Sequence, residues 1–200
     1  MRARLRNART RLAVDAVARA SDAAANHLAA SAEYAGARRI AAYVAVGNEL
    51  DPAPALARAH ADGKEIYLPC ILPQRKLRFA RWRPGDSLRE SRLGIPEPAA
   101  AAATIDPGEL DLVIVPLVGF DKSGNRLGNG GGYYDRNFGF LLRRRQGKPV
   151  LAGYAHAMQE CPRIETNEWD VPLALVVTET GIRHFVPGNP PAARPPEIGT

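Results

Sequence analysis

The amino-acid sequence predicts an α/β fold, in which helices and a mostly parallel sheet form a three-layer α/β/α sandwich. Short apolar runs of strand character alternate with helical segments along the 200 residues, an order typical of parallel sheets. The run at 110–118, LDLVIVPLV, is almost continuously apolar, as expected of a strand covered on both faces. Residues 2–35 contain no Gly or Pro and are rich in Ala, Leu and Arg, which indicates a long N-terminal helical segment.

The individual elements follow from local patterns. Residues 2–35 form one long helix or two helices that meet near Ser21 and Asp22, a plausible N-cap. A second helix is expected at 52–61, with Asp51 as its N-cap and Pro52 at its first position. A third follows the glycine-rich segment and runs through Arg145, and 84–109 is expected to be a loop with at most a short helix. The expected strands are 39–46, 65–71, 77–82, 110–118, 149–154 and 173–178. Together these elements predict a Rossmann-like arrangement.

Length and composition indicate one domain, which we expect to cover residues 1–186. Hydrophobic residues make up 46% and charged residues 24% of the chain, the balance of a soluble globular protein. The Pro-rich segment 187–200 has few apolar residues and is expected to be a disordered tail.

The expected location is the cytoplasm, and the expected partners do not include a membrane. Cys70 and Cys161 match no metal or redox spacing and are interpreted as free thiols in a reducing compartment. There is no apolar run of the roughly 20 residues needed to cross a bilayer. The Arg- and Ala-rich N-terminus also resembles an organelle transit peptide, so organelle targeting stays open.

The net charge of +6 is concentrated in two places. One is the N-terminal segment 1–19, which holds six arginines against Asp15 alone. The other is the run at 143–148, which holds Arg143, Arg144, Arg145 and Lys148. Concentrated positive charge favours an anionic ligand, either nucleic acid or a small molecule with phosphate or carboxylate groups.

The segment 121–136, DKSGNRLGNGGGYYDR, has the composition of a phosphate-binding loop. Four of the five residues at 128–132 are glycine, and they lie between a buried strand and a helix. Glycine allows positive φ and close approach, so that successive N–H groups can converge on an anion. Arg126 adds a fixed charge. Neither the Walker pattern nor GxGxxG fits the segment, and a flexible turn remains an alternative interpretation.

Asp135, close after the glycines, suggests that a phosphate-binding loop here would also bind a cation. In the predicted helix, Tyr134, Phe138 and Leu141 or Leu142 share an apolar face, whereas Asp135 lies off that face in the first turn. A carboxylate beside a phosphate site is unfavourable unless a cation lies between them, and Mg²⁺ binds carboxylates together with phosphate oxygens. Interaction of Asp135 with the helix dipole is the alternative.

The segment FDKSGNRLGNGGGYYDR at 120–136 resembles the signature of the 5-formyltetrahydrofolate cyclo-ligase family. Weaker elements agree in order: RARLR at 2–6, YVAVGNELD at 43–51, LGIPEP at 93–98 and the region 152–178. The resemblance covers residues 2–185. Arg2 stands where lysine is commoner in the family, and Trp169 differs from the residue expected before Asp170.

The resemblance implies an ATP-dependent ligase that forms a C–N bond. ATP would phosphorylate the formyl oxygen of 5-formyltetrahydrofolate, and N10 would then attack the activated carbon. Loss of phosphate would give 5,10-methenyltetrahydrofolate and ADP. Such chemistry depends on positioning and charge neutralisation.

The resemblance also implies roles for individual residues. Arg126 and Tyr133 would be catalytic, and Mg²⁺ would be the cofactor, held by Asp135 and Asp170. The ATP site would comprise Arg2, Arg6, Arg126, Leu127, Gly128, Asn129, Gly130, Gly131, Gly132, Tyr133 and Tyr134. The folate site would comprise Val44, Glu49, Gly130, Gly131, Gly132, Tyr133, Tyr134, Tyr154 and Gln159.

Three other functions remain as alternatives. One, a sugar-phosphate isomerase on a related fold, would need neither ATP nor Asp135. A non-catalytic relative could bind folate or nucleotide, although such a protein is expected to have lost Arg126, the glycines or Asp135, which are all present. A basic nucleic-acid-binding protein is compatible with the arginine clusters, but basic and aromatic residues are not interleaved, and nucleic acid is not an expected partner. The expected partners are the small molecules ATP and 5-formyltetrahydrofolate, and a polyglutamylated form of the folate stays open. The expected state is a monomer or weak homodimer.

Overall fold

The computed structural model describes residues 1–91, 94–143 and 147–185. Five α-helices and four short 3₁₀ turns lie in this part of the chain. The helices are α1 (Arg2–Thr10), α2 (Val14–Ala29), α3 (Ala32–Gly36), α4 (Ala53–Ala61) and α5 (Tyr133–Phe138). The 3₁₀ turns are η1 (Pro73–Arg75), η2 (Pro107–Glu109), η3 (Gly139–Arg143) and η4 (Ala157–Gln159).

The described residues form a central eight-stranded sheet with the order β13-β12-β10-β7-β1-β2-β3-β6. Neighbouring strands from β12 to β2 run parallel, whereas β13, β3 and β6 pair antiparallel at the two edges. The strands are β1 (Arg39–Ala41), β2 (Glu65–Ile71), β3 (Leu77–Trp82), β6 (Thr104–Ile105), β7 (Leu112–Pro116), β10 (Val150–Tyr154), β12 (Leu175–Thr178) and β13 (Gly181–His184). The predicted α/β class with a mostly parallel sheet is confirmed.

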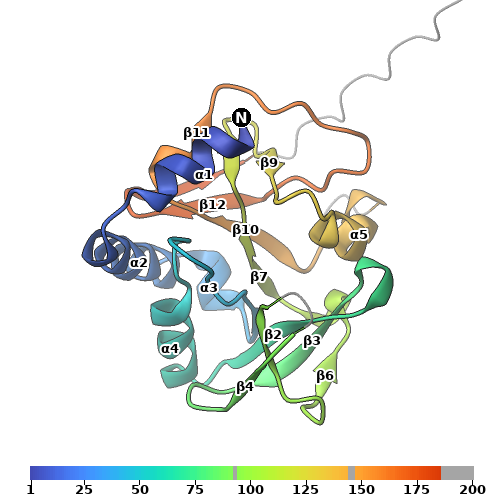
Figure 1. The fold of residues 1–200 in the computed structure, drawn as a ribbon. Helices are drawn as coiled ribbons and strands as arrows, with labels where there is room; N and C mark the ends of the chain where they lie inside the picture. The colour runs from blue at the N-terminus through green and yellow to red at the C-terminus, as the bar shows by residue number, and fades with distance from the viewer. Residues whose placement is uncertain (92–93, 144–146, 186–200) are drawn as a thin grey trace, which may run out of the picture.

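Both faces of this sheet are buried, and the side chains of β7 alternate between them. Leu112 and Ile114 belong to a core beneath α2 and α4, whereas Val113 and Val115 belong to a second core with Phe138 of α5. Figure 1 shows α2 and α4 on one side of the sheet and α5 on the other. The alternation follows from the two-residue period of a strand, and helices on both sides explain why the 110–118 run is apolar throughout.

Two smaller sheets extend the molecule. β8 (Gly119–Asp121), β9 (Arg126–Leu127) and β11 (Glu160–Cys161) form a three-stranded sheet beside the carboxyl end of β7. β4 (Leu88–Glu90) pairs with β5 (Pro96–Pro98). The 84–109 segment therefore contains short strands, which the sequence pattern did not indicate.

The N-terminal segment divides at a different place from the one predicted. Three helices, not one or two, occupy this segment, with breaks at residues 11–13 and 30–31, and Ser21 lies inside α2. Its hydroxyl accepts a hydrogen bond from Asp51 N–H. At the end of α1, the side chain of Asn48 donates hydrogen bonds to the carbonyls of Arg9, Thr10 and Leu12. Asn48 thus caps the C-terminal end of α1, and the N-cap of α2 is Ala13, which makes no side-chain hydrogen bond.

Other boundaries also differ. The helix after the glycines ends at Phe138 and continues as the 3₁₀ turn η3 through Arg143, and the predicted strand 39–46 is regular only at 39–41. Tyr134, Phe138 and Leu141 pack in the same core, as predicted, whereas Leu142 is exposed. Arg144, Arg145 and the 187–200 tail lie outside the described residues.

Cys70 and Cys161 are free and buried, in agreement with their interpretation as thiols. Among the described residues, no helix is both long and apolar enough to span a membrane.

Candidate active site

The candidate site lies where the strand order reverses. From β1 the chain passes through α4 to β2 on one side, whereas β7, β10 and β12 follow one another on the other side. Ligands of open α/β sheets bind outside the carboxyl ends of the strands at such a switch point. The segments that leave these ends of β1, β7 and β10 are 42–49, 117–132 and 155–159. They contain most of the residues that the sequence implicated.

A tight turn aims Arg126 at the site. The carboxylate of Asp121 accepts hydrogen bonds from the N–H groups of Ser123, Asn125 and Ile164. It thereby fixes the β8–β9 hairpin, and β9 carries Arg126 and Leu127. The sequence analysis did not identify Asp121 as a residue with a role, although it is the aspartate of the FD pair in the signature.

The glycine loop follows β9 directly. Gly130 and Gly132 have φ values of +97° and +64°, which side chains with a Cβ rarely adopt. A Cβ on Gly131 would lie 2.7 Å from the ring of Tyr133, so this glycine is required by close packing. Gly132 precedes the first residue of α5. Asn129, Gly130 and Gly132 are exposed, and the loop is therefore accessible to a ligand.

Arg126 and Asp135, which were assigned separate roles, form an ion pair across this loop. Arg126 Nη2 lies 2.5 Å from Asp135 Oδ1, and 6% of the Arg126 side chain is exposed. The same oxygen accepts a hydrogen bond from Val171 N–H at 3.1 Å. The buried Nε of Arg126 has no hydrogen-bond partner within the described residues. The Arg126 guanidinium is thus oriented by Asp135, and its Nε–H remains available to donate to a ligand.

Helix α1 brings two more arginines to the loop. Leu5 anchors the helix in a small core with Val118, Cys161 and Ile164. Arg2 Nε donates to the carbonyl of Gly128 at 2.9 Å, and Arg6 Nη2 donates to Asn129 Oδ1 at 2.7 Å. Figure 1 shows α1 lying next to β9 and β11. Predicted ATP residues that lie more than 120 positions apart in the sequence therefore meet in space.

Glu49 is buried next to the last turn of α1. Its Oε2 accepts a hydrogen bond from Val46 N–H at 3.1 Å, and its Oε1 lies 3.4 Å from Arg9 Nη2. Burial raises the pKa of Glu49, although the Val46 hydrogen bond and Arg9 act in the opposite direction. Val44 is half-buried beside the core under α2 and α4. The sequence analysis missed Arg9, although its position one turn after Arg6 could have indicated it.

Tyr154 and Gln159 form contacts within the protein around the site. Tyr154 is buried in the core, and its hydroxyl lies 3.4 Å from the carbonyl of Ser21. The amide nitrogen of Gln159 donates to the carbonyls of Leu117 and Val118, and its oxygen accepts from His156 N–H. The contacts of Tyr154 and Gln159 are therefore internal ones, which stabilise the backbone around the site.

The two tyrosines after the glycines belong to the second core. Tyr134 stacks on Phe138 with ring centroids 6.1 Å apart, and burial raises the pKa of its hydroxyl. Asn137, another residue that the sequence analysis missed, donates to the carbonyls of Tyr133 and Arg75 and accepts from Leu77 N–H. This side chain ties the start of α5 to the β2–β3 connection.

The carboxylates of the two predicted metal ligands, Asp135 and Asp170, are held by different groups. Val171, which follows Asp170, donates to Asp135, whereas the carboxylate of Asp170 accepts from Asn167 N–H at 2.8 Å. Asp135 Oδ2 has no hydrogen-bond partner in the described part of the chain, which leaves one oxygen available to a cation. The described residues contain no group of three or more His, Cys, Asp or Glu suited to a metal. A free carboxylate oxygen beside a phosphate site is the kind of ligand that Mg²⁺ takes together with phosphate oxygens.

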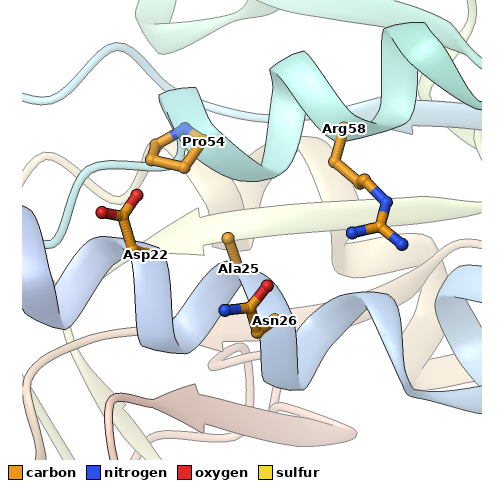
Figure 2. Close-up of a pocket in the computed structure, with 5 residues that line it drawn as sticks. All are labelled: Asp22, Ala25, Asn26, Pro54 and Arg58. Atoms are coloured by element: carbon orange, nitrogen blue, oxygen red, sulfur yellow. The ribbon is translucent and has the colours of Figure 1, made fainter.

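Two of the cavities in the described part of the chain differ in how they relate to the site. One of about 620 Å³ borders Asp135 and is also lined by Arg136, Phe140 and Trp169. The other, of about 340 Å³, lies between α2 and α4, where Asp22 and Arg58 line it (Figure 2). The first cavity adjoins the candidate site through Asp135. The second is lined by none of the predicted site residues.

Comparison with known proteins gives consistent results. The sequence model of the 5-formyltetrahydrofolate cyclo-ligase family matches residues 1–179. The 5-formyltetrahydrofolate cyclo-ligase of Escherichia coli K12 is 37% identical over 149 residues, covering 73% of this chain and 80% of its own. The enzyme of that name from Haemophilus influenzae is 33% identical over 177 residues, covering 86% and 92%. The solved structure of Aquifex aeolicus 5,10-methenyltetrahydrofolate synthetase aligns with a TM-score of 0.78 and 30% identity, covering 94% of this chain and 92% of that one.

Proposed function

Because this chain belongs to the 5-formyltetrahydrofolate cyclo-ligase family, we propose that it converts 5-formyltetrahydrofolate and ATP into 5,10-methenyltetrahydrofolate, ADP and phosphate. The observation that carries this function is the glycine loop at the switch point of the sheet, bordered by Arg2, Arg6 and Arg126. These three cations can neutralise a nucleotide polyphosphate.

In the proposed reaction, the formyl oxygen attacks the γ-phosphorus of ATP and the bond to ADP breaks. The N10 amine then adds to the activated carbon and loses its proton, and the C–O bond breaks to release phosphate. N–H groups of the glycine loop orient the phosphates, and Arg126 donates to the transferring group. Arg126 and Tyr133 are the residues that we place at the reacting atoms.

The ATP site also includes the loop residues 127–134 and the two arginines of α1. Asp135 and Asp170 would hold Mg²⁺, which supplies charge neutralisation on the phosphate oxygens when it is bound. Each of these carboxylates is held through one oxygen, Asp135 by Arg126 and Val171 and Asp170 by Asn167, and its other oxygen would be the one that contacts the cation.

The folate would lie between the glycine loop and the segment after β1. Glu49 and Val44 come from that segment, and residues 130–134 from the loop. Tyr154 and Gln159 would shape the folate site indirectly, by supporting the backbone around it. Polyglutamylated folate, a monomer or weak homodimer, and a cytoplasmic location remain predictions.

The test is turnover by the purified protein. With ATP, Mg²⁺ and 5-formyltetrahydrofolate, we expect the near-ultraviolet absorbance of the methenyl product to appear, and we expect no product when ATP is omitted. A folded protein that binds ATP and folate without turnover would indicate a non-catalytic relative. Salt-dependent binding of random DNA without turnover would favour the nucleic-acid alternative.

A further inference from the structure

One helix contacts both halves of the proposed site. The first turns of α1 reach the glycine loop through Arg2 and Arg6. Its last turn carries Arg9, whose Nη2 lies 3.4 Å from Glu49 Oε1. Arg6 and Arg9 are three residues apart and are therefore neighbours on the helix surface. The sequence pattern assigned no role to Arg9.

The Arg9–Glu49 pair is shielded from water. The exposed fractions of the two side chains are 12% and 11%, so that solvent screens their attraction far less than that of a surface pair. Within the described residues, Arg9 has no other salt bridge, and its buried Nε has no hydrogen-bond partner. Removing one member of such a pair leaves the other charge uncompensated.

The backbone around this pair is held by other contacts. Asn48 donates to the carbonyl of Leu12 at 2.9 Å, and more weakly to those of Arg9 and Thr10. The carbonyl of Asn48 in turn lies 3.2 Å from His156 Nε2. Because these bonds do not involve the Arg9 guanidinium, its removal should release the Glu49 carboxylate and leave the end of α1 in place.

We propose that Arg9 is a positioning residue for folate, whose guanidinium keeps the Glu49 carboxylate ionised and oriented to accept hydrogen bonds from N–H donors of the substrate. This inference depends on the proposed role of Glu49. A protonated Glu49 would present a donor to the same groups and bind them less well. Burial raises the pKa of Glu49, and Arg9 is one of the groups that oppose this rise.

The experiment compares Arg9→Met, Arg9→Lys, Glu49→Gln and the Arg9→Met/Glu49→Gln double variant. Methionine keeps the apolar stem and removes the charge. Arg4→Met is the matched control, because Arg4 is exposed on the same helix and has no salt bridge within the described structure. For each protein, KM for 5-formyltetrahydrofolate is measured at saturating ATP, and KM for ATP at saturating folate, alongside the melting temperature.

We expect Arg9→Met to raise the folate KM about tenfold or more, with a much smaller change in the ATP KM. Arg9→Lys should recover part of this loss. In the Glu49→Gln background, Arg9→Met should change the folate KM little further, because the carboxylate on which Arg9 acts has been replaced by a neutral amide. Arg4→Met should match the wild type.

Equal increases in both KM values, or full additivity with Glu49→Gln, would overturn the inference. If Arg9→Met does not fold, the same cycle is run with Arg9→Lys, whose smaller effect must also vanish in the Glu49→Gln background. A wild-type protein without turnover would refute the proposed function instead, and so the two failures can be distinguished.

Discussion

The side chains of Arg126 and Asp135 form an ion pair across the glycine loop, with 2.5 Å between Nη2 and Oδ1. The arginine comes from β9 and the aspartate from the first turn of α5, so the pair joins the two ends of the loop. It fixes the direction of a buried guanidinium before any phosphate is bound, which lowers the reorganisation needed during phosphoryl transfer.

Replacing Arg126 with Met should therefore reduce kcat/KM by about 100-fold or more. Arg126→Lys should restore little of the activity, because an ammonium lacks the planar fork that bonds Asp135 and phosphate together. Steady-state turnover and circular dichroism provide the measurement and the check on folding. A folded Arg126→Met protein with near wild-type turnover would contradict the catalytic role.

Asp135→Asn should raise the Mg²⁺ concentration needed for half-maximal turnover, since an amide is a weaker ligand than a carboxylate. Calorimetric titration with ATP, with and without Mg²⁺, gives a readout that is independent of turnover. Asp170→Asn is the comparison at the second proposed ligand, whose carboxylate accepts a hydrogen bond from Asn167 N–H, and it should also raise this concentration. An unchanged Mg²⁺ requirement in Asp135→Asn would remove this residue from the metal site.

Gly132→Ala should lower the free energy of unfolding by about 1–2 kcal/mol and raise the ATP KM, because φ at this position is +64°. Gly139→Ala is the matched control. Its φ is −55° and no atom lies within 4 Å of the added Cβ, so its stability should be unchanged or slightly increased. Chemical denaturation measures both, and equal stabilities of the two variants would contradict the prediction.

Asp111 should contribute pH-dependent stability. Burial alone would raise its pKa, but hydrogen bonds from Lys148 and from the N–H groups of Arg39 and Arg38 prevail and lower the pKa. Its contribution is therefore present above the pKa of the unfolded state and is lost as pH falls through the folded one. Asp111→Asn should lower the unfolding free energy at neutral pH by about 1–3 kcal/mol. The difference from wild type should shrink in acid, and a constant difference would count against this account.

Folate binding should weaken in mild acid. Burial raises the pKa of Glu49 above the usual value of 4.5, so protonation begins at a higher pH than for an exposed glutamate. The charged and titratable groups around it are Arg9, Arg6, Tyr43 and Tyr134. The folate KM of the wild type should rise as pH falls, whereas Glu49→Gln, which controls for titration of the folate itself, should show a flatter profile. Parallel profiles would contradict the prediction.

The local patterns predicted most of the central fold. The bounds of β2 and β3 agree with their expected ranges, because a buried strand must present apolar side chains along its length. The sequence pattern did not indicate β8, β9 and β11, which are two or three residues long. Such short strands carry almost no periodicity and form through pairing between distant segments.

The sequence by itself determined the glycine loop, because positive φ and close packing at residues 130–132 require residues without a Cβ. The tertiary structure decided how the loop is completed. The pairing of Arg126 with Asp135 depends on the β8–β9 hairpin, and the pairing of Arg9 with Glu49 depends on where α1 docks. The side chains in each pair come from different elements, and only packing brings these elements together. No spacing along the chain encodes that proximity.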